Sequence, residues 1–187
     1  MSEVFTFVDS SALTSKLTMW EERDKSIQAG YEKFNNEVLP KFAKDKDVRI
    51  GAKGKNKFWF GYKKQQSVDM QSGMINKVAV TRANVTDAEG ASHVLPKTGA
   101  VPADKGYVGA IPKMIKRGLH PMVILRDNMK DKNRDKDRFI TKLRAPYEGT
   151  FSKQAKRTRY KGLMKNQAAE FLYAIAFNFR RLIVLES

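Results

Sequence analysis

The chain has 187 residues, which is enough for one well-packed domain and too few for two large ones. Its 36 Lys and Arg residues outnumber its 20 Asp and Glu residues, and the resulting formal net charge of +16 favours a polyanionic partner such as nucleic acid. The absence of Cys excludes disulfides and thiolate zinc sites, and with only two His residues any catalytic chemistry must rely on carboxylates. No apolar run approaches the roughly 20 residues that cross a bilayer, so we expect no membrane partner.

The first third of the chain predicts a strand, a helical segment and a basic loop. Residues 4–8 (VFTFV) are β-branched or aromatic, which predicts a strand that ends at Asp9. Residues 19–44 carry apolar side chains at roughly helical spacing, which predicts a helix interrupted near its proline. Residues 44–57 are basic and contain glycines, which predicts a loop. We therefore expect a helical and basic insert after the first strand, at about residues 18–57.

The middle of the chain predicts a hairpin followed by a short helix and a buried strand. Residues 58–69 and 74–81 predict two strands joined by a Gln-Ser-Gly turn. Asp87 is predicted to cap a short helix. Residues 100–103 (AVPA) predict a short apolar strand that ends at Asp104.

The last third predicts mainly helices. The pattern indicates a helix over residues 111–117 that a glycine closes, and a buried strand over residues 121–125. Residues 126–138 carry dense mixed charge and predict a solvated loop. Residues 139–156 and 165–185 then predict two helices, of which the second has the stronger pattern.

The final helix carries an apolar stripe that includes Phe171, Ile175 and Leu182. Such a stripe at helical spacing is typical of a side that faces the core, so we expect these residues to be buried. The order of elements predicts one mixed α/β domain over residues 1–187, with a sheet flanked by helices.

Three carboxylates are the candidate catalytic groups. Asp9 and Asp104 each follow an apolar strand, and carboxylates at neighbouring strand ends can share a cation. Glu148 lies in the penultimate helical pattern. Oxygen ligands of this kind suit Mg²⁺, and two such ions can assist an in-line attack on a phosphodiester. Spacing alone leaves open that all three are ordinary turn, cap and surface residues, and it predicts structural roles for the competing Asp69 and Asp87.

Several stretches resemble bacterial insertion-sequence transposases of the DDE type. Residues 7–11 (FVDSS) resemble the segment with the first Asp, and residues 101–107 (VPADKGY) resemble the motif with the second Asp. Residues 147–153 (YEGTFSK) and 159–163 (RYKGL) resemble the helix with the Glu and the tail that follows it. Residues 176–182 (AFNFRRL) resemble the usual terminal helix. The resemblance covers nearly the whole chain in the right order.

This resemblance implies an RNase H-like fold and a DNA-cutting and DNA-joining activity. It assigns catalysis and the binding of Mg²⁺ or Mn²⁺, as two ions, to Asp9, Asp104 and Glu148. The family's Arg four residues before the Glu is present as Arg144. The chain departs from the family pattern at Thr141, where Tyr is expected, at Ala155, where Lys is expected, and at Gly149, where Arg is common. These departures put local DNA contacts in doubt more than they do the metal site.

The resemblance and the basic charge together imply that DNA, as transposon ends and as target, is the partner. The candidate DNA-binding residues are Arg144, Lys153, Lys156, Arg157, Arg159 and Lys161. For any single one of them a solvated basic face is the alternative. The family further implies a homodimer in the active complex and a place in the bacterial cytoplasm at the nucleoid.

Two other functions fit the composition, namely a non-catalytic basic nucleic-acid-binding module and an RNase H-like nuclease that does not transpose. Family members carry an N-terminal region for recognising transposon ends, and the sequence begins only eight residues before Asp9. We therefore expect a truncated gene, a second reading frame or an excised catalytic fragment, which lacks this region and binds DNA with little end specificity.

Overall fold

The computed structural model describes residues 5–17, 19–54, 56–152 and 154–186. The strands are β1 (Thr6–Ser15), β2 (Arg49–Lys53), β3 (Lys57–Asp69), β4 (Ile75–Arg82), β5 (Ala100–Ala103), β6 (His120–Val123) and β7 (Arg157–Thr158). The helices are α1 (Trp20–Gln28), α2 (Leu39–Phe42), α3 (Asp87–Gly90), α4 (Ile111–Lys116), α5 (Arg134–Ser152) and α6 (Leu163–Glu186), with 3₁₀ turns η1 (Ala91–His93) and η2 (Lys105–Ala110). None of the helices in these ranges is long and apolar enough to span a membrane.

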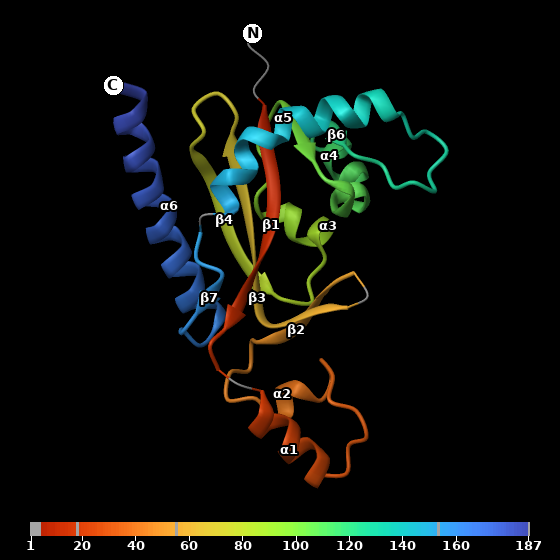
Figure 1. Cartoon of the computed structure of the whole chain (residues 1–187), viewed down its shortest axis with the longest axis vertical. Coiled ribbons are helices and arrows are strands. Elements are labelled where there is room, and N and C mark those ends of the chain that lie inside the picture. The colour runs from red at the N-terminus through yellow and green to blue at the C-terminus, as the bar shows by residue number, and fades with distance from the viewer. Residues whose placement is uncertain (1–4, 18, 55, 153, 187) are drawn as a thin grey trace.

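The long strand β3 organises the main sheet (Figure 1). It pairs antiparallel with β1 from Thr6–Asp69 to Thr14–Gly61, and antiparallel with β4 on its other side. Strand β2 pairs with the first residues of β3, and β7 pairs parallel with the end of β1. The predicted hairpin of β3 and β4 is confirmed.

The parallel pair β5 and β6 continues the sheet beyond β1. A parallel bridge between Phe5 and Ala100 joins β5 to the start of β1. The strand order across the molecule is therefore β4, β3, β1, β5, β6, with antiparallel pairs on one side of β1 and parallel pairs on the other. This arrangement confirms a mixed α/β fold with a mixed sheet. A core cluster around Val8, Tyr107 and Met114 packs η2 and α4 against this part of the sheet.

Strand β1 does not end at Asp9 as predicted but continues to Ser15. The polar run after Asp9 is a poor strand by composition, yet β3 offers a backbone partner at each position up to Thr14. Hydrogen bonding along this ladder overrides the weak β-propensity of the segment. The consequence is that Asp9 lies inside a central strand, where its backbone is fixed by neighbours.

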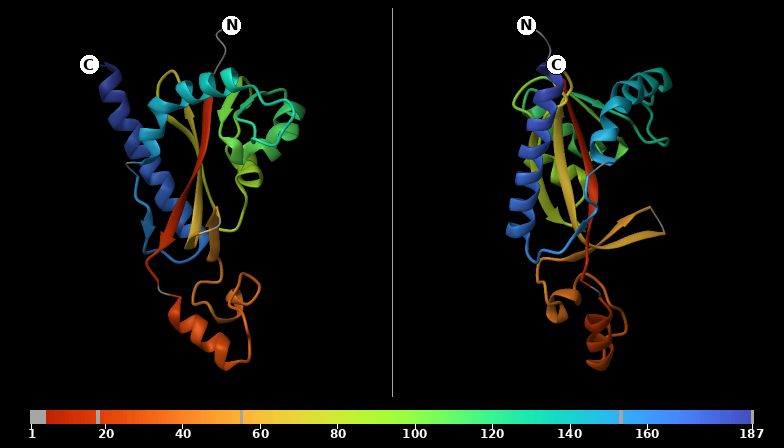
Figure 2. Two further views of the ribbon diagram at one scale, coloured as in Figure 1. Left: turned by 45° about the vertical axis from the view of Figure 1, so that its right-hand side comes forward. Right: turned by 60° about the vertical axis from the view of Figure 1, so that its left-hand side comes forward.

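The segment over residues 18–57 contains two helices and also a strand, so the predicted loop at residues 44–57 is partly wrong. Helices α1 and α2 lie below the sheet, apart from the other helices (Figure 2). Strand β2 pairs with β3, and Gly51 allows the Trp59 ring to lie against its backbone, since a Cβ on Gly51 would come within 2.4 Å of that ring. Ile50 adds a contact to the core cluster of Leu39 and Tyr62.

Helix α6 packs on the sheet with a different side from the one predicted. Phe171 and Ile175 are exposed by half or more, and Leu182 is also exposed, so their predicted burial is wrong. The side that faces the sheet carries two amides as well as Ala174, which is buried in a core cluster with Phe7 and Val68. Asn178 accepts from the Ile75 N–H (2.8 Å) and donates to the Ile75 carbonyl (2.9 Å).

Gln167 repeats this arrangement one step further along β4. Its side chain accepts from the Val80 N–H (2.7 Å) and donates to the Val78 carbonyl (3.1 Å). Strand β4 is an edge strand, because β3 is its one partner among the described strands. The two amides satisfy backbone groups that an edge would otherwise leave open, while Ala174, Tyr173 and Phe177 of the same helix supply apolar contacts to the sheet.

Candidate active site

Asp9 lies on the central strand of the sheet, and a backbone N–H orients its carboxylate. The Ser10 N–H donates to Asp9 Oδ1 at 2.8 Å. Burial raises the pKa of Asp9 to about 6, the Ser10 hydrogen bond opposes this rise, and the nearby Asp104 carboxylate adds to it. An acid whose charged form is disfavoured by burial and by a second acid gains from a bound cation.

Asp104 directly follows β5, as predicted, and caps the 3₁₀ turn η2. Its Oδ1 accepts from the Gly106 N–H at 2.8 Å. Because β5 lies beside β1, Asp104 stands close enough to Asp9 to raise the pKa of its carboxyl. Two carboxylates on neighbouring strands, each fixed by a backbone N–H, offer the hard oxygen ligands that Mg²⁺ or Mn²⁺ takes.

Glu148 lies on α5 and is not gathered with the two aspartates. Its side chain is 54% exposed and forms an ion pair with Arg144 across one helical turn, at 3.5 Å. Arg144 is buried, its guanidinium lies 5.2 Å from the centre of the Phe7 ring, and its charge lowers the pKa of Asp9. Among the described residues, no group of three or more His, Cys, Asp or Glu side chains is placed to hold a metal ion.

Arg144 therefore interacts with both parts of the predicted site, namely Glu148 on α5 and Asp9 on β1. It was predicted to contact DNA, and in the structure its side chain is turned inward toward Asp9 and Glu148. The positive charge of this buried guanidinium favours the charged form of Asp9, as a bound cation would. DNA contact by Arg144 stays a prediction.

Asp87 joins this region although the sequence assigned it to a helix cap. The cap is Thr86, whose hydroxyl accepts from the Glu89 N–H while Glu89 bonds back to the Thr86 N–H. Asp87 Oδ1 instead accepts from the Ser10 hydroxyl at 2.7 Å and from Lys63 Nζ at 3.0 Å. The Thr-x-x-Glu spacing of Thr86 and Glu89 is typical of a capping box, so the sequence could have predicted that Thr86, rather than Asp87, caps this helix.

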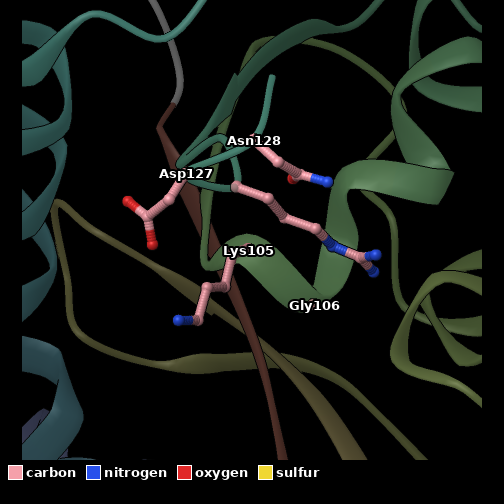
Figure 3. Close-up of a pocket in the computed structure, with 5 residues that line it drawn as sticks. Lys105, Gly106, Asp127 and Asn128 are labelled. Carbon is pink, nitrogen blue, oxygen red and sulfur yellow. The ribbon is translucent and has the colours of Figure 1, made fainter.

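An open pocket of about 430 Å³ lies next to Asp104. Figure 3 shows Lys105 and Gly106 on the turn that follows β5, with Asp127 and Asn128 across from them on the loop after β6. Arg126 also lines this pocket. Lys105 and Arg126 were not among the predicted site residues, although Lys105 directly follows Asp104 in the motif.

The predicted basic segment lies at the other end of β1. Lys156, Arg157, Arg159 and Lys161 are all exposed, whereas Lys153 lies outside the described residues. Strand β7 fixes this segment by pairing with the last residues of β1, and Arg157 and Arg159 line an open pocket of about 270 Å³ together with Lys16. With about 3.3 Å per strand residue, this segment begins about 17 Å along β1 from Asp9.

Comparison with known families identifies the chain. A family model described as the transposase DDE domain matches residues 24–172, well over half of the sequence. The chain belongs to the DDE transposases. The resemblance inferred from the motifs is thereby confirmed. No curated protein and no solved structure is significantly similar to the chain.

The matched part of this DDE transposase domain contains Asp104 and Glu148, and Asp9 precedes it. The carboxylates fit a divalent cation by their chemistry, because all are oxygen donors and because burial and the Asp104 charge disfavour the free Asp9 carboxylate. The described geometry brings Asp9 and Asp104 together and leaves Glu148 paired with Arg144.

Proposed function

We propose that this transposase domain cuts DNA at transposon ends and joins the resulting 3′-hydroxyl to target DNA in a reaction that depends on Mg²⁺ or Mn²⁺. One observation carries the proposal. In a chain of the DDE family, Asp9 lies on β1 and Asp104 directly follows the adjacent strand β5, each held by a backbone N–H, with the pKa of Asp9 raised to about 6.

Asp9, Asp104 and Glu148 would hold the metal. Bound divalent ions supply positive charge that activates the attacking oxygen and stabilises the leaving oxygen. The residues of the chain do the rest. The backbone N–H groups of Ser10 and Gly106 orient the two aspartates, and the pairing of β1 with β3 keeps Asp9 in place.

Glu148 would complete the site by leaving Arg144. The ion pair between them is longer than a good hydrogen bond and one partner is half exposed, so it offers little resistance to this exchange. Arg144, released from Glu148, would then be free to meet a phosphate of the DNA near the cut.

DNA would be held by the basic segment over residues 156–161. A separation of about 17 Å along β1 corresponds to about five base pairs of DNA, at about 3.4 Å per nucleotide of one strand. These cations would therefore contact phosphates on one side of the cut, while Lys105 and Arg126, which line the pocket next to Asp104, would contact DNA at the cut.

The strand order supports an RNase H-like core, because three antiparallel strands are followed by two parallel ones, with the acids on the central strand and its parallel neighbour. A homodimer in the active complex, an origin in an insertion sequence and a place at the bacterial nucleoid follow from the same family membership and stay predictions.

A strand-transfer assay with Mg²⁺ tests the proposal. The variants Asp9→Asn, Asp104→Asn and Glu148→Gln should each lose activity by at least about a thousandfold, and Asp135→Asn, on an exposed side chain of α5, should not. Wild-type activity in all three would end the proposal. Metal-independent DNA binding without cleavage would instead identify a binding module, and cleavage of the RNA strand of a hybrid without joining would identify a nuclease.

A further inference from the structure

We propose that Asp87 is a positioning residue of the metal site, which holds the Lys63 ammonium in a neutral pair and so keeps its charge from opposing a cation at Asp9 and Asp104. This inference rests on the proposed function. It concerns a residue outside the Asp-Asp-Glu set, and it makes a statement about metal affinity that does not depend on catalysis.

The first support is the contact of Asp87 with the strand that carries Asp9. The Ser10 hydroxyl donates to Asp87 Oδ1 at 2.7 Å, and Ser10 is also the residue whose N–H holds the Asp9 carboxylate. Lys63, on the neighbouring strand β3, donates to the same Asp87 oxygen at 3.0 Å and to the Val85 carbonyl at 2.7 Å. Asp87 thus connects β1 and β3 from outside the sheet ladder.

The second support is the contact of Asp87 with the turn that carries Asp104. A Cβ built on Gly106 would lie 2.7 Å from Asp87 Oδ2 and 3.0 Å from Asp104 Oδ1, so both carboxylates converge on this glycine. A side chain at residue 106 would separate them. Burial raises the pKa of Tyr107, and the charges of Asp9, Asp87 and Asp104 add to this rise.

The third support is the balance of charge between Asp87 and Lys63, next to Asp9 and Asp104. Lys63 is largely buried, and its ammonium donates to Asp87 and to one backbone carbonyl. A buried ammonium needs an anionic partner. While Asp87 supplies that partner, Asp9 and Asp104 remain available to a divalent cation. Without Asp87, the Lys63 charge would repel that cation.

The two members of the pair therefore have opposite effects on metal affinity. Asp87→Asn leaves Lys63 uncompensated and should weaken cation binding. Lys63→Met leaves the Asp87 carboxylate uncompensated beside Asp9 and Asp104 and should strengthen it. The double variant removes both charges and should bind nearly as wild type does. A purely structural role would make both single variants bind worse.

Direct Mn²⁺ binding to the whole chain, followed by electron paramagnetic resonance of the free ion, tests this. We expect on the order of tenfold weaker binding for Asp87→Asn, several-fold tighter binding for Lys63→Met, and a double variant within about threefold of wild type. Lys136→Met, at an exposed position on α5, is the matched control for loss of a lysine.

Weaker binding by both single variants, or no change in either, would overturn the proposal. If Asp87→Asn does not fold, Lys63→Met still decides, because unfolding cannot tighten metal binding. Failure of the proposed function looks different. In that case wild type and Asp9→Asn would bind Mn²⁺ equally, whereas failure of this inference alone would leave Asp9→Asn defective and the Asp87 and Lys63 variants like wild type.

Discussion

The two aspartates and the glutamate of the proposed site are held in very different ways. Asp9 lies on β1 and Asp104 directly follows the adjacent strand β5, and a backbone N–H fixes each carboxylate. Glu148 projects from α5 with half of its side chain exposed, and its one described partner is Arg144 on the same helix. Strand-borne ligands are placed by pairing with several neighbours, whereas a helix-borne ligand moves with the whole helix.

Local features of α5 add to this difference. Pro146 lies inside the helix, where it removes one backbone hydrogen bond, and Gly149 directly follows Glu148 and lowers helix propensity. On the proposed function, Asp9 and Asp104 (the strand half of the site) would be in place before metal binds, and Glu148 on α5 (the helix half) would have to move to join them. Each of the following experiments separates the two halves.

The largest expected effect is the difference in Mn²⁺ affinity between variants of the two aspartates and a variant of Glu148. Asp9→Asn and Asp104→Asn should each weaken Mn²⁺ binding by at least about a hundredfold, because they remove a fixed ligand, while Glu148→Gln should weaken it by about tenfold or less. Titration calorimetry measures this. Equal losses for all three variants would show that Glu148 is as well placed as the aspartates, contrary to the comparison.

The next effect is on stability as a function of pH, without divalent metal. The folded pKa of Asp9 is about 6 and its ordinary value is 3.8, so the folded chain binds more protons than the unfolded chain between these values. The free energy of unfolding should therefore fall as pH rises from about 4 to about 6, by at most about 3 kcal/mol.

Chemical denaturation at a series of pH values measures this slope. Asp9→Asn should flatten it, and Mg²⁺ should restore stability above pH 6 in the wild type alone. Glu148→Gln is the matched control and should leave the slope unchanged. A slope that persists in Asp9→Asn would mean that another group causes it.

A smaller effect is expected on the free energy of unfolding when the contacts of α6 with the edge strand β4 are removed. Asn178→Ala and Gln167→Ala should each lower the free energy of unfolding by about 1 to 3 kcal/mol, because each leaves an N–H and a carbonyl of β4 unsatisfied. Phe179→Ala, on the exposed side of α6, should change it by about 0.5 kcal/mol or less. Urea denaturation distinguishes these values, and a larger loss for Phe179→Ala would contradict this account of α6.

The smallest effect is on the link between the halves. Arg144→Met removes a positive charge that lowers the pKa of Asp9, so the pH at which Mn²⁺ binding is half-maximal should rise, by about one unit or less. Glu148 loses its partner at the same time. An unchanged pH midpoint of Mn²⁺ binding would show that the charge of Arg144 does not affect Asp9.

The sequence predicted the local setting of Asp104 better than that of Asp9. Asp104 follows an apolar four-residue strand, and that boundary is where the pattern places it. The length of β1 was not predictable from composition, because the polar residues after Asp9 form a strand only when β3 pairs with them. Local propensity carries no information on such a distant partner.

The side of α6 that packs on the sheet could not be predicted for a related reason. An apolar stripe predicts a core, and the stripe of Phe171, Ile175 and Leu182 is real, yet Asn178 and Gln167 dock on an edge strand whose backbone needs partners. The contacts of Asp87 with Ser10 and Lys63 were not predicted, because the sequence pattern places Asp87 at a helix cap that Thr86 and Glu89 in fact form.

Anomalous diffraction from Mn²⁺ in crystals of the chain tests the central claim most directly. The account predicts a peak between the carboxylates of Asp9 and Asp104, with both as ligands, and with Glu148 either turned from Arg144 toward the ion or still paired. Mn²⁺ bound away from both aspartates, in crystals saturated with the ion, would contradict it.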